Sequence, residues 1–486
     1  MREELQQALR HVIAGYRHQQ RGEFYAAQRD YREAVRLGYA DPLLINNAGV
    51  VSMMTGNLRE GLRIIRKAAL STAAPPAVYS NYLCARLLDP AAVPSHLHRD
   101  HLRWKPVTPP AGVPVAARTR GRYVRIGYVS ASFRRHAVMS FFPPLLTQRD
   151  RERFHVTCYS STVSRDATTE WVQQHADQWR DVARSSDDDL ERNIRSDEID
   201  ILVDLDGHFL NNRLAVFARK PAPVTATYLG YPFTTGLESI DYRITDARAD
   251  PPGKTERWHA ERLARIRSPF LAYVPAAEAL EFPAASEKDL TEPVVFGCFG
   301  QFDKIGNTLL AIWKQILDRV PASILILKSA ALADEGTRKW NRRRFARLGI
   351  DPDRIDLRPF TPSWKEHFKS YRCIDIALDT YPSNGTTTTC DALLMGVPVV
   401  ALTGQTHHSR VGASLLAAVG RPSWATGSPA EYVETAVALG GMVRRLRQSR
   451  ARLRERFLES PLCDGQRLVR NLERLFLAWA DRHLGE

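Results

Sequence analysis

Two successive arrays of short apolar segments constrain the fold of this chain more than any other feature. The segments are rich in β-branched residues and alternate with stretches of helical spacing, which is typical of buried parallel strands joined by helices. The first array comprises YVRIGYVS, FHVTCYS, IDILVDLDG, VTATYLG and YRITD, and the second comprises VVFGCFG, SILILKS, RIDLRPF, IDIALDT and PVVAL. We therefore expect an α/β protein with two Rossmann-like domains, whose ligands bind beyond the carboxyl ends of the strands.

A repeat with a period of 34 residues precedes these arrays. Five positions recur: Gly22, Phe24, Ala27, Tyr31 and Ala34 return as Gly56, Leu58, Gly61, Ile65 and Ala68. The small residues allow paired helices to approach closely, and the large residues fill the space between them. The period resembles that of tetratricopeptide repeats, with a generic helical bundle as the plainer alternative. A third, incomplete repeat starts at about Ala77 and stops near Asp89.

Changes of composition predict the domain boundaries. We expect repeat-like helices over residues 1–89, a linker over 90–120, a first Rossmann-like lobe over 121–275, a second over 276–455 and a C-terminal helix over 456–486. The linker contains PSHLHRDH, which is interpreted as a helix rather than a metal site, and a proline-rich connector from Lys105 to Arg120. The stretch from Pro269 to Thr291 is rich in Ala, Pro and Glu and is interpreted as the connection between the lobes.

Composition narrows the partners and the compartment. The 68 Lys and Arg residues against 54 Asp and Glu give a net charge of +14, which favours anionic ligands. The arginines are spread over segments such as VRRLRQSRARLRERF, interpreted as a solvated helix face, so we expect no nucleic-acid partner. Six scattered cysteines indicate free thiols in a reducing compartment. The charged amphipathic start is no signal peptide, and no stretch reaches the ~20 apolar residues of a membrane span, so we expect a cytoplasmic protein.

The clearest chemical motif is LDTYPSNGTTTTCDALLMGVP, from Leu378 to Pro398. A buried strand leads into the tight turn Asn384-Gly385, and four threonines then begin a helix. Free backbone N–H groups and the helix dipole hold phosphate at such a helix start, and threonine hydroxyls add further donors. The alternative is that the threonines only cap the helix.

A second motif, GCFGQFDKIGN, follows the first strand of the second array. Its Gln301 and Lys304 occupy the first strand–helix turn, where both side chains can reach a diphosphate, although a surface role is the default for a lysine. The chain contains no Walker loop, and no G-x-G-x-x-G follows a strand, which disfavours ATP hydrolysis and a dehydrogenase.

Two further loops follow strands of the first array. In RIGYVSASFRRHAVMSFF the loop presents His136, a candidate general base near neutral pH, with a structural histidine as the alternative. In the segment from Ile201 to Gly236, His208 and Arg213 follow one strand and Gly230-Tyr231-Pro232 follows the next, where small residues let a sugar approach the backbone. The same segment carries two aspartates, Asp204 and Asp206, on one strand face, but without a third ligand we expect no metal.

Together these four segments resemble the catalytic region of the O-GlcNAc transferase family, glycosyltransferase family 41, which includes plant SPINDLY. The resemblance runs from Arg125 to about Leu439 and is carried also by IDYRITDARADPPG and SRVGASLLAAVG. It implies a GT-B fold, in which two Rossmann-like domains hold a nucleotide sugar. It also implies an inverting, metal-independent transfer of N-acetylglucosamine from UDP-GlcNAc to Ser or Thr hydroxyls of proteins, without a cofactor.

The resemblance assigns roles residue by residue. His136 matches a histidine proposed as base, and Gly230 and Tyr231 match the turn beside the sugar. For the donor phosphates, Gln301 and Lys304 match contact residues, and Thr387 and Thr388 match hydroxyls at the phosphate-binding helix start. For the nucleoside, His367 matches a uridine contact and Asp391 matches a ribose contact. His208 and Arg213 are candidates for contact with the sugar or the acceptor. Lys304 and the threonine hydroxyls would stabilise charge on the leaving UDP where other enzymes use Mg²⁺.

Three departures from the family pattern keep alternatives open. Trp364 stands where the animal enzymes have a lysine, the long insertion between their lobes is missing, and the repeat array is far shorter. SPINDLY members transfer fucose, and other relatives transfer glucose to asparagine, so another donor or acceptor is possible. The repeats indicate a protein acceptor as partner, and the alternative outside catalysis is a nucleotide-sensing interaction scaffold.

Overall fold

The computed structural model describes residues 2–106, 123–267, 269–284, 288–361 and 363–484. These residues form two compact units, which we name by their sheets. The six-stranded unit comprises Met1–Ala92, Ala276–Gly404 and Val411–Leu458, and the seven-stranded unit comprises Val93–Pro275, Gln405–Arg410 and Glu459–Glu486. Most of the predicted proline-rich connector lies outside the described residues.

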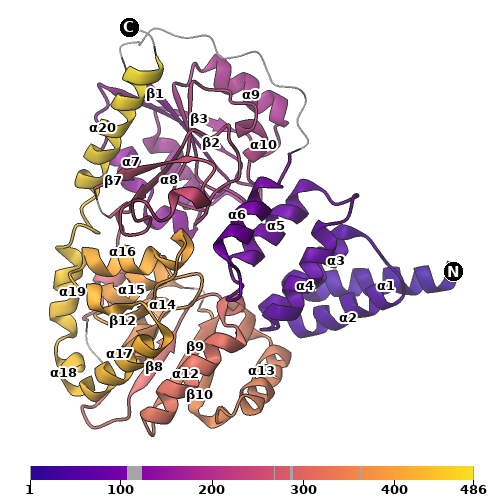
Figure 1. Ribbon diagram of the computed structural model, residues 1–486, viewed down its shortest axis with the longest axis vertical. Helices are drawn as coiled ribbons and strands as arrows, with labels where there is room; N and C mark the ends of the chain where they lie inside the picture. Colours follow the sequence, from indigo (N-terminus) through magenta and orange to yellow (C-terminus); the bar gives the residue numbers. More distant parts are fainter. Residues whose placement is uncertain (1, 107–122, 268, 285–287, 362, 485–486) are drawn as a thin grey trace. The chain divides into compact units, whose positions relative to one another are not determined.

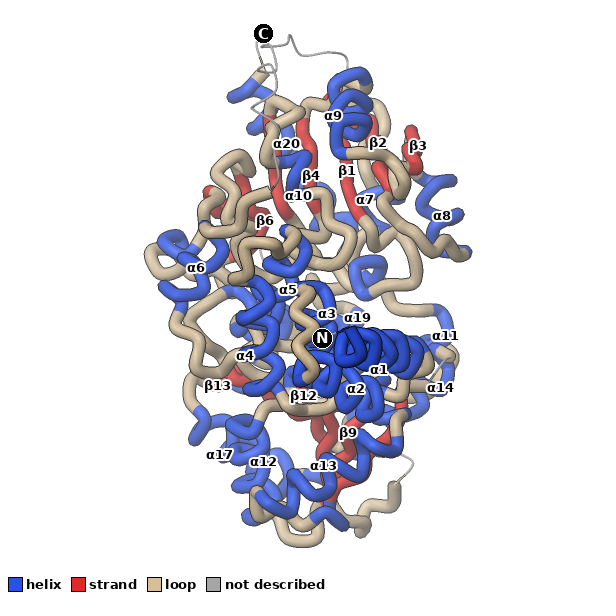
Figure 2. Tube along the Cα trace, turned by 90° about the vertical axis from the view of Figure 1, so that its right-hand side faces the viewer, coloured by secondary structure: helices blue, strands red, loops and turns tan. Residues whose placement is uncertain are grey.

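The seven-stranded unit contains a parallel sheet with the strand order β3-β2-β1-β4-β5-β6-β7 (Figure 2). Its strands are β1 (Val124–Ser130), β2 (Phe154–Ser160), β3 (Gln178–Asp181), β4 (Ile201–Asp204), β5 (Val224–Thr227), β6 (Tyr242–Asp246) and β7 (Arg262–Ile266). Its helices are α6 (Pro94–Leu102), α7 (Pro143–Thr147), α8 (Ala167–His175), α9 (Asp187–Ser196), α10 (Leu214–Phe217) and α20 (Gly465–His483). The sequence predicted β1, β2, β4, β5 and β6 but missed β3 and β7.

The C-terminal helix α20 belongs to the seven-stranded unit, although it follows the second array in the sequence. Trp479 stacks on Tyr242 of β6 with ring centroids 4.3 Å apart, and Glu473 accepts a hydrogen bond from the backbone N–H of Asp150. The apolar face of the helix supplies this contact, with Leu472 and Phe476 buried. Across the described part of the chain, no helix combines the length and the apolar character needed to cross a membrane.

The six-stranded unit contains a second parallel sheet, with the order β10-β9-β8-β11-β12-β13. Its strands are β8 (Val295–Cys298), β9 (Ile324–Ser329), β10 (Ile355–Pro359), β11 (Ile376–Leu378), β12 (Val399–Leu402) and β13 (Ala425–Thr426). Beside it lie α11 (Ala277–Leu280), α12 (Asn307–Arg319), α13 (Glu335–Arg347), α14 (Trp364–Ser370), α15 (Thr387–Leu394), α16 (Val411–Ala418), α17 (Pro429–Gly441), α18 (Val443–Gln448) and α19 (Arg450–Leu458). The two parallel sheets confirm the predicted fold class.

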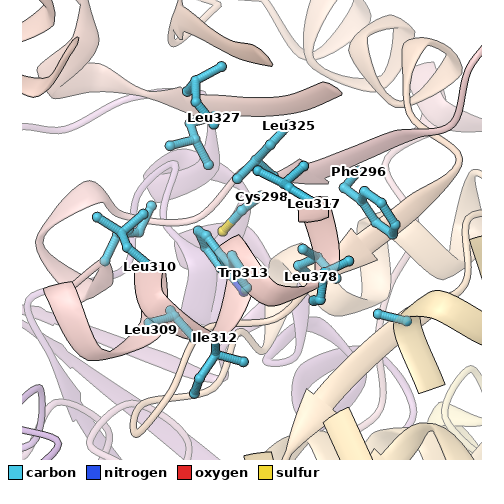
Figure 3. Close-up of a cluster of buried hydrophobic side chains, with 14 of the residues drawn as sticks. Phe296, Cys298, Leu309, Leu310, Ile312, Trp313, Leu317, Leu325, Leu327 and Leu378 are labelled. Carbon is cyan, nitrogen blue, oxygen red and sulfur yellow. The ribbon is translucent and has the colours of Figure 1, made fainter. Parts of the chain in front are cut away.

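Trp313 of α12 lies at the centre of the core of this unit (Figure 3). Its side chain is fully buried among leucines of α12 and of the sheet, and its indole N–H donates to the hydroxyl of Tyr432, 3.2 Å away. The Tyr432 hydroxyl in turn donates to the backbone carbonyl of Asp379, at 3.0 Å. Because Asp379 follows β11 directly, this hydrogen-bonded chain ties the core to the carboxyl end of the sheet.

The N-terminal repeats form α1 (Arg2–Gln20), α2 (Phe24–Arg36), α3 (Pro42–Met54), α4 (Leu58–Ala69) and α5 (Pro76–Arg86), which pack in order (Figure 1). The repeated glycines Gly22 and Gly56 both adopt positive φ at helix-to-helix turns, at +74° and +93°. Helices α3 and α4 approach so closely that a Cβ on Gly61 would lie 2.7 Å from the carbonyl oxygen of Gly49. The helical-hairpin prediction is confirmed.

The repeats pack on the six-stranded sheet's helix α13. The side-chain amide of Asn341 donates to the backbone carbonyl of Thr55 at 2.9 Å, and the backbone N–H of Tyr25 donates to Asp334 at 2.8 Å. Phe24 and Met54 pack against the core that surrounds Trp313. The array is thus part of one compact unit with the second sheet.

The interpretation of VRRLRQSRARLRERF as a wholly solvated face is wrong. Arg447 and Arg450 are 6% and 2% exposed. Arg447 forms a buried ion pair with Asp375 at 2.7 Å and donates to backbone carbonyls, including that of Pro293, while Arg450 donates to the carbonyls of Tyr371 and Ile374. The physical reason is that a guanidinium supplies five donors and satisfies carbonyls that end strands and turns.

Candidate active site

The threonine-rich turn lies beyond the carboxyl end of β11 and leads into α15. The carboxylate of Asp379 accepts the backbone N–H groups of Gly385 and Thr380 at 2.7 and 2.8 Å. The amide of Asn384 donates to the carbonyl of Thr380 at 3.0 Å. A Cβ on Gly385 would overlap the hydroxyl oxygen of Thr388, so only glycine lets the turn approach the helix start this closely.

Lys304 lies against this turn. It ends the short 3₁₀ helix Phe302–Lys304 after β8, and its ammonium donates to the backbone carbonyl of Asn384 at 3.2 Å. Strands β8 and β11 are neighbours in the sheet, which explains how two segments 80 residues apart meet. Thr387 and Thr388 are half-buried at the start of α15, and Gln301 is exposed just before the 3₁₀ helix. The structure therefore brings Lys304 and the threonine cluster together.

Asp379 is an ionisable residue of this turn that was not among the predicted site residues. Its carboxylate is buried, and Oδ2 makes no hydrogen bond among the described residues. Burial raises the pKa of Asp379 to about 7, while the N–H of Gly385 and then Lys304 act in the opposite direction. The available signal was the position of Asp379 at the end of a buried strand, where a carboxylate is unusual.

His367 and Asp391 meet in a buried group that includes a lysine. His367 of α14 contacts Asp391 of α15 through Nε2 and Oδ2, 3.1 Å apart. Its other ring nitrogen, Nδ1, lies 3.1 Å from the ammonium of Lys328, the fifth residue of β9. Burial lowers the pKa of Lys328 to about 8. Neither the place of Lys328 in this site nor the contact of His367 with Asp391 was predicted from the sequence, although a lysine inside the apolar segment SILILKS is unusual.

His136 belongs to the seven-stranded unit and lies in an exposed loop after β1. Its Nδ1 accepts a hydrogen bond from the backbone N–H of Val138 at 3.3 Å, which caps the 3₁₀ helix Ala137–Ser140. Desolvation by surrounding atoms, and then the nearby charge of Arg134, lower the pKa of His136. A lowered pKa favours the neutral ring, and the contact with Val138 favours the tautomer with its proton on Nε2.

Tyr231 and His208 lie in a buried aromatic cluster of the seven-stranded unit. The Tyr231 hydroxyl donates to Nε2 of His101 at 2.7 Å, and His208 donates to the carbonyl of Thr235 at 2.8 Å. Both side chains are 1% exposed, and burial lowers the pKa of His208 to about 4. Gly230 is half-buried, and a Cβ there would overlap the carbonyl oxygen of Leu205. The backbone of this turn, rather than the Tyr231 ring, is its accessible part.

Arg213 is held within its own unit. Its guanidinium donates to Ser161, to the carboxylate of Asp187 at 2.9 Å, and to the carbonyls of Val182 and Ser185. These contacts give the side chain a structural partner on every nitrogen. Its predicted contact with sugar or acceptor remains a prediction.

Asp204 and Asp206 are both buried and hydrogen-bonded. Asp204 accepts from the hydroxyl of Thr227 at 2.8 Å, and Asp206 accepts from Ser130 and Ser132 at 3.0 and 2.9 Å. Burial raises the pKa of Asp204 to about 7 and that of Asp206 to about 6. No group of three or more His, Cys, Asp or Glu side chains among the described residues is arranged to hold a metal ion.

Comparison with known proteins identifies the family. The model of glycosyl transferase family 41 matches residues 108–275 and 283–472. The chain belongs to glycosyltransferase family 41. The matched segments include the threonine turn, Lys304 and the loop of His136.

Curated relatives support the same assignment. The chain is 41% identical over 358 residues to a Solanum lycopersicum protein named probable UDP-N-acetylglucosamine–peptide N-acetylglucosaminyltransferase SPINDLY, a match covering 72% of this chain and 38% of the relative. It is 32% identical over 397 residues to an Arabidopsis thaliana protein of the same activity name, SEC, with coverages of 78% and 39%. The chain thus spans about two fifths of the length of these relatives.

A solved structure resembles nearly the whole chain. A variant of the Thermobaculum terrenum O-GlcNAc transferase superposes with a TM-score of 0.87 at 32% sequence identity, over 96% of this chain and 89% of that one. The similarity includes the helical repeats as well as both sheets. The predicted GT-B fold with a preceding repeat-like region is confirmed.

Proposed function

We propose that this family 41 chain is an inverting, metal-independent glycosyltransferase that moves N-acetylglucosamine from UDP-GlcNAc to Ser or Thr hydroxyls of proteins. The observation that carries the proposal is the meeting of Lys304 with the turn that opens α15, where a cation, hydroxyls and free helix N–H groups lie together. Such a group of donors suits a diphosphate. The reaction needs no cofactor, because the UDP-sugar is itself the substrate.

The turn that opens α15 is assigned to stabilising the negative charge of the leaving group. As the bond between sugar and phosphate breaks, negative charge grows on UDP, and the ammonium of Lys304 with the hydroxyls of Thr387 and Thr388 stabilises it. Donors that are already held in place cost no reorganisation during the reaction, and each contributes about 2–4 kcal/mol to lowering the barrier. The carbonyl of Asn384 fixes the Lys304 ammonium in that place.

The nucleoside is assigned to the neighbouring group on α14 and α15. His367 and Asp391 contact the uridine base and the ribose, and their mutual hydrogen bond holds both side chains before the donor arrives. Gln301 contributes an exposed amide beside the diphosphate. This assignment keeps every nucleotide contact within the six-stranded unit.

His136 is assigned to the acceptor. Because its Nδ1 accepts the Val138 N–H, the neutral ring presents Nε2–H and can donate to an oxygen. We therefore assign His136 a role in orienting the acceptor or the sugar. Gly230 offers the backbone beside which the sugar lies.

The protein acceptor is recognised in part by the repeats. The scattered cysteines support a cytoplasmic location.

A donor panel tests the proposal. The protein is incubated with an acceptor protein mixture and UDP-GlcNAc, UDP-glucose or GDP-fucose, with and without excess EDTA, and products are identified by mass spectrometry. We expect transfer from UDP-GlcNAc that survives EDTA and yields the inverted anomer. Strict dependence on a divalent cation, or transfer only from GDP-fucose, would contradict the proposal. The variant Lys304→Ala tests the role of the Lys304 ammonium in this transfer. Lys339→Ala, which removes an exposed lysine of α13, is its matched control.

A further inference from the structure

Lys328 is a buried cation that neither the sequence motifs nor the proposed reaction uses. It lies near the carboxyl end of β9 and is 2% exposed. Its ammonium lies 3.1 Å from Nδ1 of His367, 3.1 Å from the hydroxyl of Ser370 and 3.5 Å from the backbone carbonyl of His367. The ring of Phe299 lies on another side, with its centroid 4.7 Å from the ammonium.

A count of protons fixes the chemistry of this group. An ammonium has three N–H donors and no acceptor. The hydroxyl of Ser370 donates its own proton to the carbonyl of Glu366 at 2.7 Å, so it accepts from Lys328. The three donors of Lys328 therefore have three acceptors, one of which is Nδ1 of His367. That nitrogen carries no proton, so the imidazole proton is on Nε2 and is donated to Asp391, 3.1 Å away.

We propose that Lys328 is a positioning residue for recognition of the donor nucleoside, acting through the tautomer and orientation of His367. This inference rests on the proposed function, because it concerns the nucleotide site of the same reaction. With Nδ1 held by Lys328 and Nε2 held by Asp391, the ring cannot rotate or change tautomer without breaking a buried hydrogen bond. The nucleoside of a UDP-sugar then meets His367 and Asp391 in a fixed arrangement, which avoids the cost of ordering them on binding.

The charged and titratable groups around Lys328 define its pH dependence. Asp391 of α15 favours the ammonium, and Arg358 of β10 disfavours it. The third such group, Cys373, lies on the 3₁₀ turn Tyr371–Cys373, which follows α14. Burial outweighs these charges and lowers the pKa of Lys328 to about 8. Above that pH the neutral amine has a lone pair of its own, so it no longer dictates which nitrogen of His367 is protonated. We therefore expect donor affinity to fall as the pH rises through about 8.

The test compares Lys328→Met with Lys369→Met, which removes an exposed lysine of the same helix as His367. UDP affinity is measured by calorimetry, and donor KM and kcat are measured on both sides of pH 8 in the full-length protein. For Lys328→Met we expect a rise of about tenfold or more in the UDP Kd and the donor KM, and a much smaller change in kcat. The fall in donor affinity as the pH rises through about 8 should be absent from this variant. Lys369→Met should match the wild type in every respect.

A second measurement needs no variant that could misfold. The ¹⁵N shifts of His367 in the wild-type protein report which ring nitrogen carries the proton, and we expect Nε2–H at neutral pH. An Nδ1–H tautomer, or a Lys328→Met variant with wild-type UDP affinity and pH profile, overturns the inference while leaving the glycosyltransferase proposal intact. A wild-type protein that neither binds UDP nor transfers sugar refutes the proposed function, and the inference falls with it.

Discussion

The turn between α3 and α4 offers a sharp test of how the repeats support the turn after β8 that carries Lys304. Gly56 adopts φ +93°, and a Cβ at this position would lie 2.7 Å from both Nη1 of Arg344 and Oδ1 of Asn341, and 3.1 Å from the ring of Phe302. These three side chains are buried. Gly56→Ala therefore forces a buried guanidinium, a buried amide and an aromatic ring to move.

Gly22→Ala is the matched control for this substitution. Gly22 occupies the same place one repeat earlier, with φ +74°, but a Cβ there would have nothing within 4 Å. Both variants bear the cost of placing alanine in left-handed backbone, about 1–2 kcal/mol. Only Gly56→Ala also bears the cost of overpacking, about 1–3 kcal/mol. We expect thermal unfolding to show clearly greater destabilisation for Gly56→Ala than for Gly22→Ala.

The structure also predicts an effect on nucleotide affinity. Arg344 donates to the backbone carbonyl of Ile305 at 2.8 Å and to the side chain of Asn307 at 2.7 Å. Ile305 directly follows Lys304, so displacing Arg344 disturbs the turn that places Lys304. Calorimetric titration with UDP should show weaker binding to Gly56→Ala and unchanged binding to Gly22→Ala. Equal destabilisation of the two variants, or wild-type UDP affinity in Gly56→Ala, would refute this reasoning.

Substitutions at three other residues test the site. Lys304→Ala should lower sugar-transfer turnover by about a hundredfold with little change in Tm, because it removes a charged donor to the leaving group and few core contacts; near-normal turnover would contradict its placement. His136→Asn retains an acceptor for the Val138 N–H and a donor beyond it, so transfer should largely survive, whereas His136→Ala should lose it; equal loss in both variants would favour a base. Asp379→Asn should change the pH dependence of stability. With a pKa raised to about 7, the native carboxyl keeps a proton that the unfolded chain has released, so the free energy of unfolding falls as the pH rises from about 4 to 7 and levels off above that. The Asn variant should lack that fall in denaturant titrations at several pH values, and an identical profile would show that Asp379 is ionised throughout.

The interior strands of both sheets were predictable from the sequence, whereas three of the four edge strands that the structure describes were not; the exception is β10, which the segment RIDLRPF predicted. The segments that became β1, β4, β8 and β12 are apolar on both faces because helices or other layers cover both sides of a parallel sheet. The missed strand β3 reads QWRD and is half-buried to exposed at one edge of its sheet. The missed β7 is the opposite edge of the same sheet. The missed β13 is a two-residue strand at one edge of the six-stranded sheet. Such short or polar edge strands owe their conformation to a neighbour that is not visible in their own sequence, whereas β10 alternates the buried Ile355 and Leu357 with polar residues and so carries its own pattern.

The candidate site shows the same division. Lys304 and the threonine cluster were predictable because each follows a strand directly, and parallel strands end at the same edge of the sheet. Lys328 and Asp379 were not, because their importance comes from partners on other elements: His367 lies on α14, and Lys304 lies on the turn after β8. Tyr231 was predicted in the turn beside the sugar, which stays a prediction; the hydrogen bond of its hydroxyl to His101, 130 positions away, was not predictable from the sequence.

The positive charge of the chain has a structural explanation that changes what its excess means. Buried and half-buried arginines of the six-stranded unit satisfy polar groups of the chain: the half-buried Arg354 donates to the carbonyls of Leu317, Val320 and Ser323, and the buried Arg447 pairs with Asp375. Asp375 in turn accepts the backbone N–H of Val295 at 2.9 Å, where β8 begins. A cation whose donors are used in this way contributes little to binding an anionic ligand. In the proposed reaction, the attraction for a nucleotide therefore depends on Lys304, beside the carboxyl end of β8, more than on the net charge of +14.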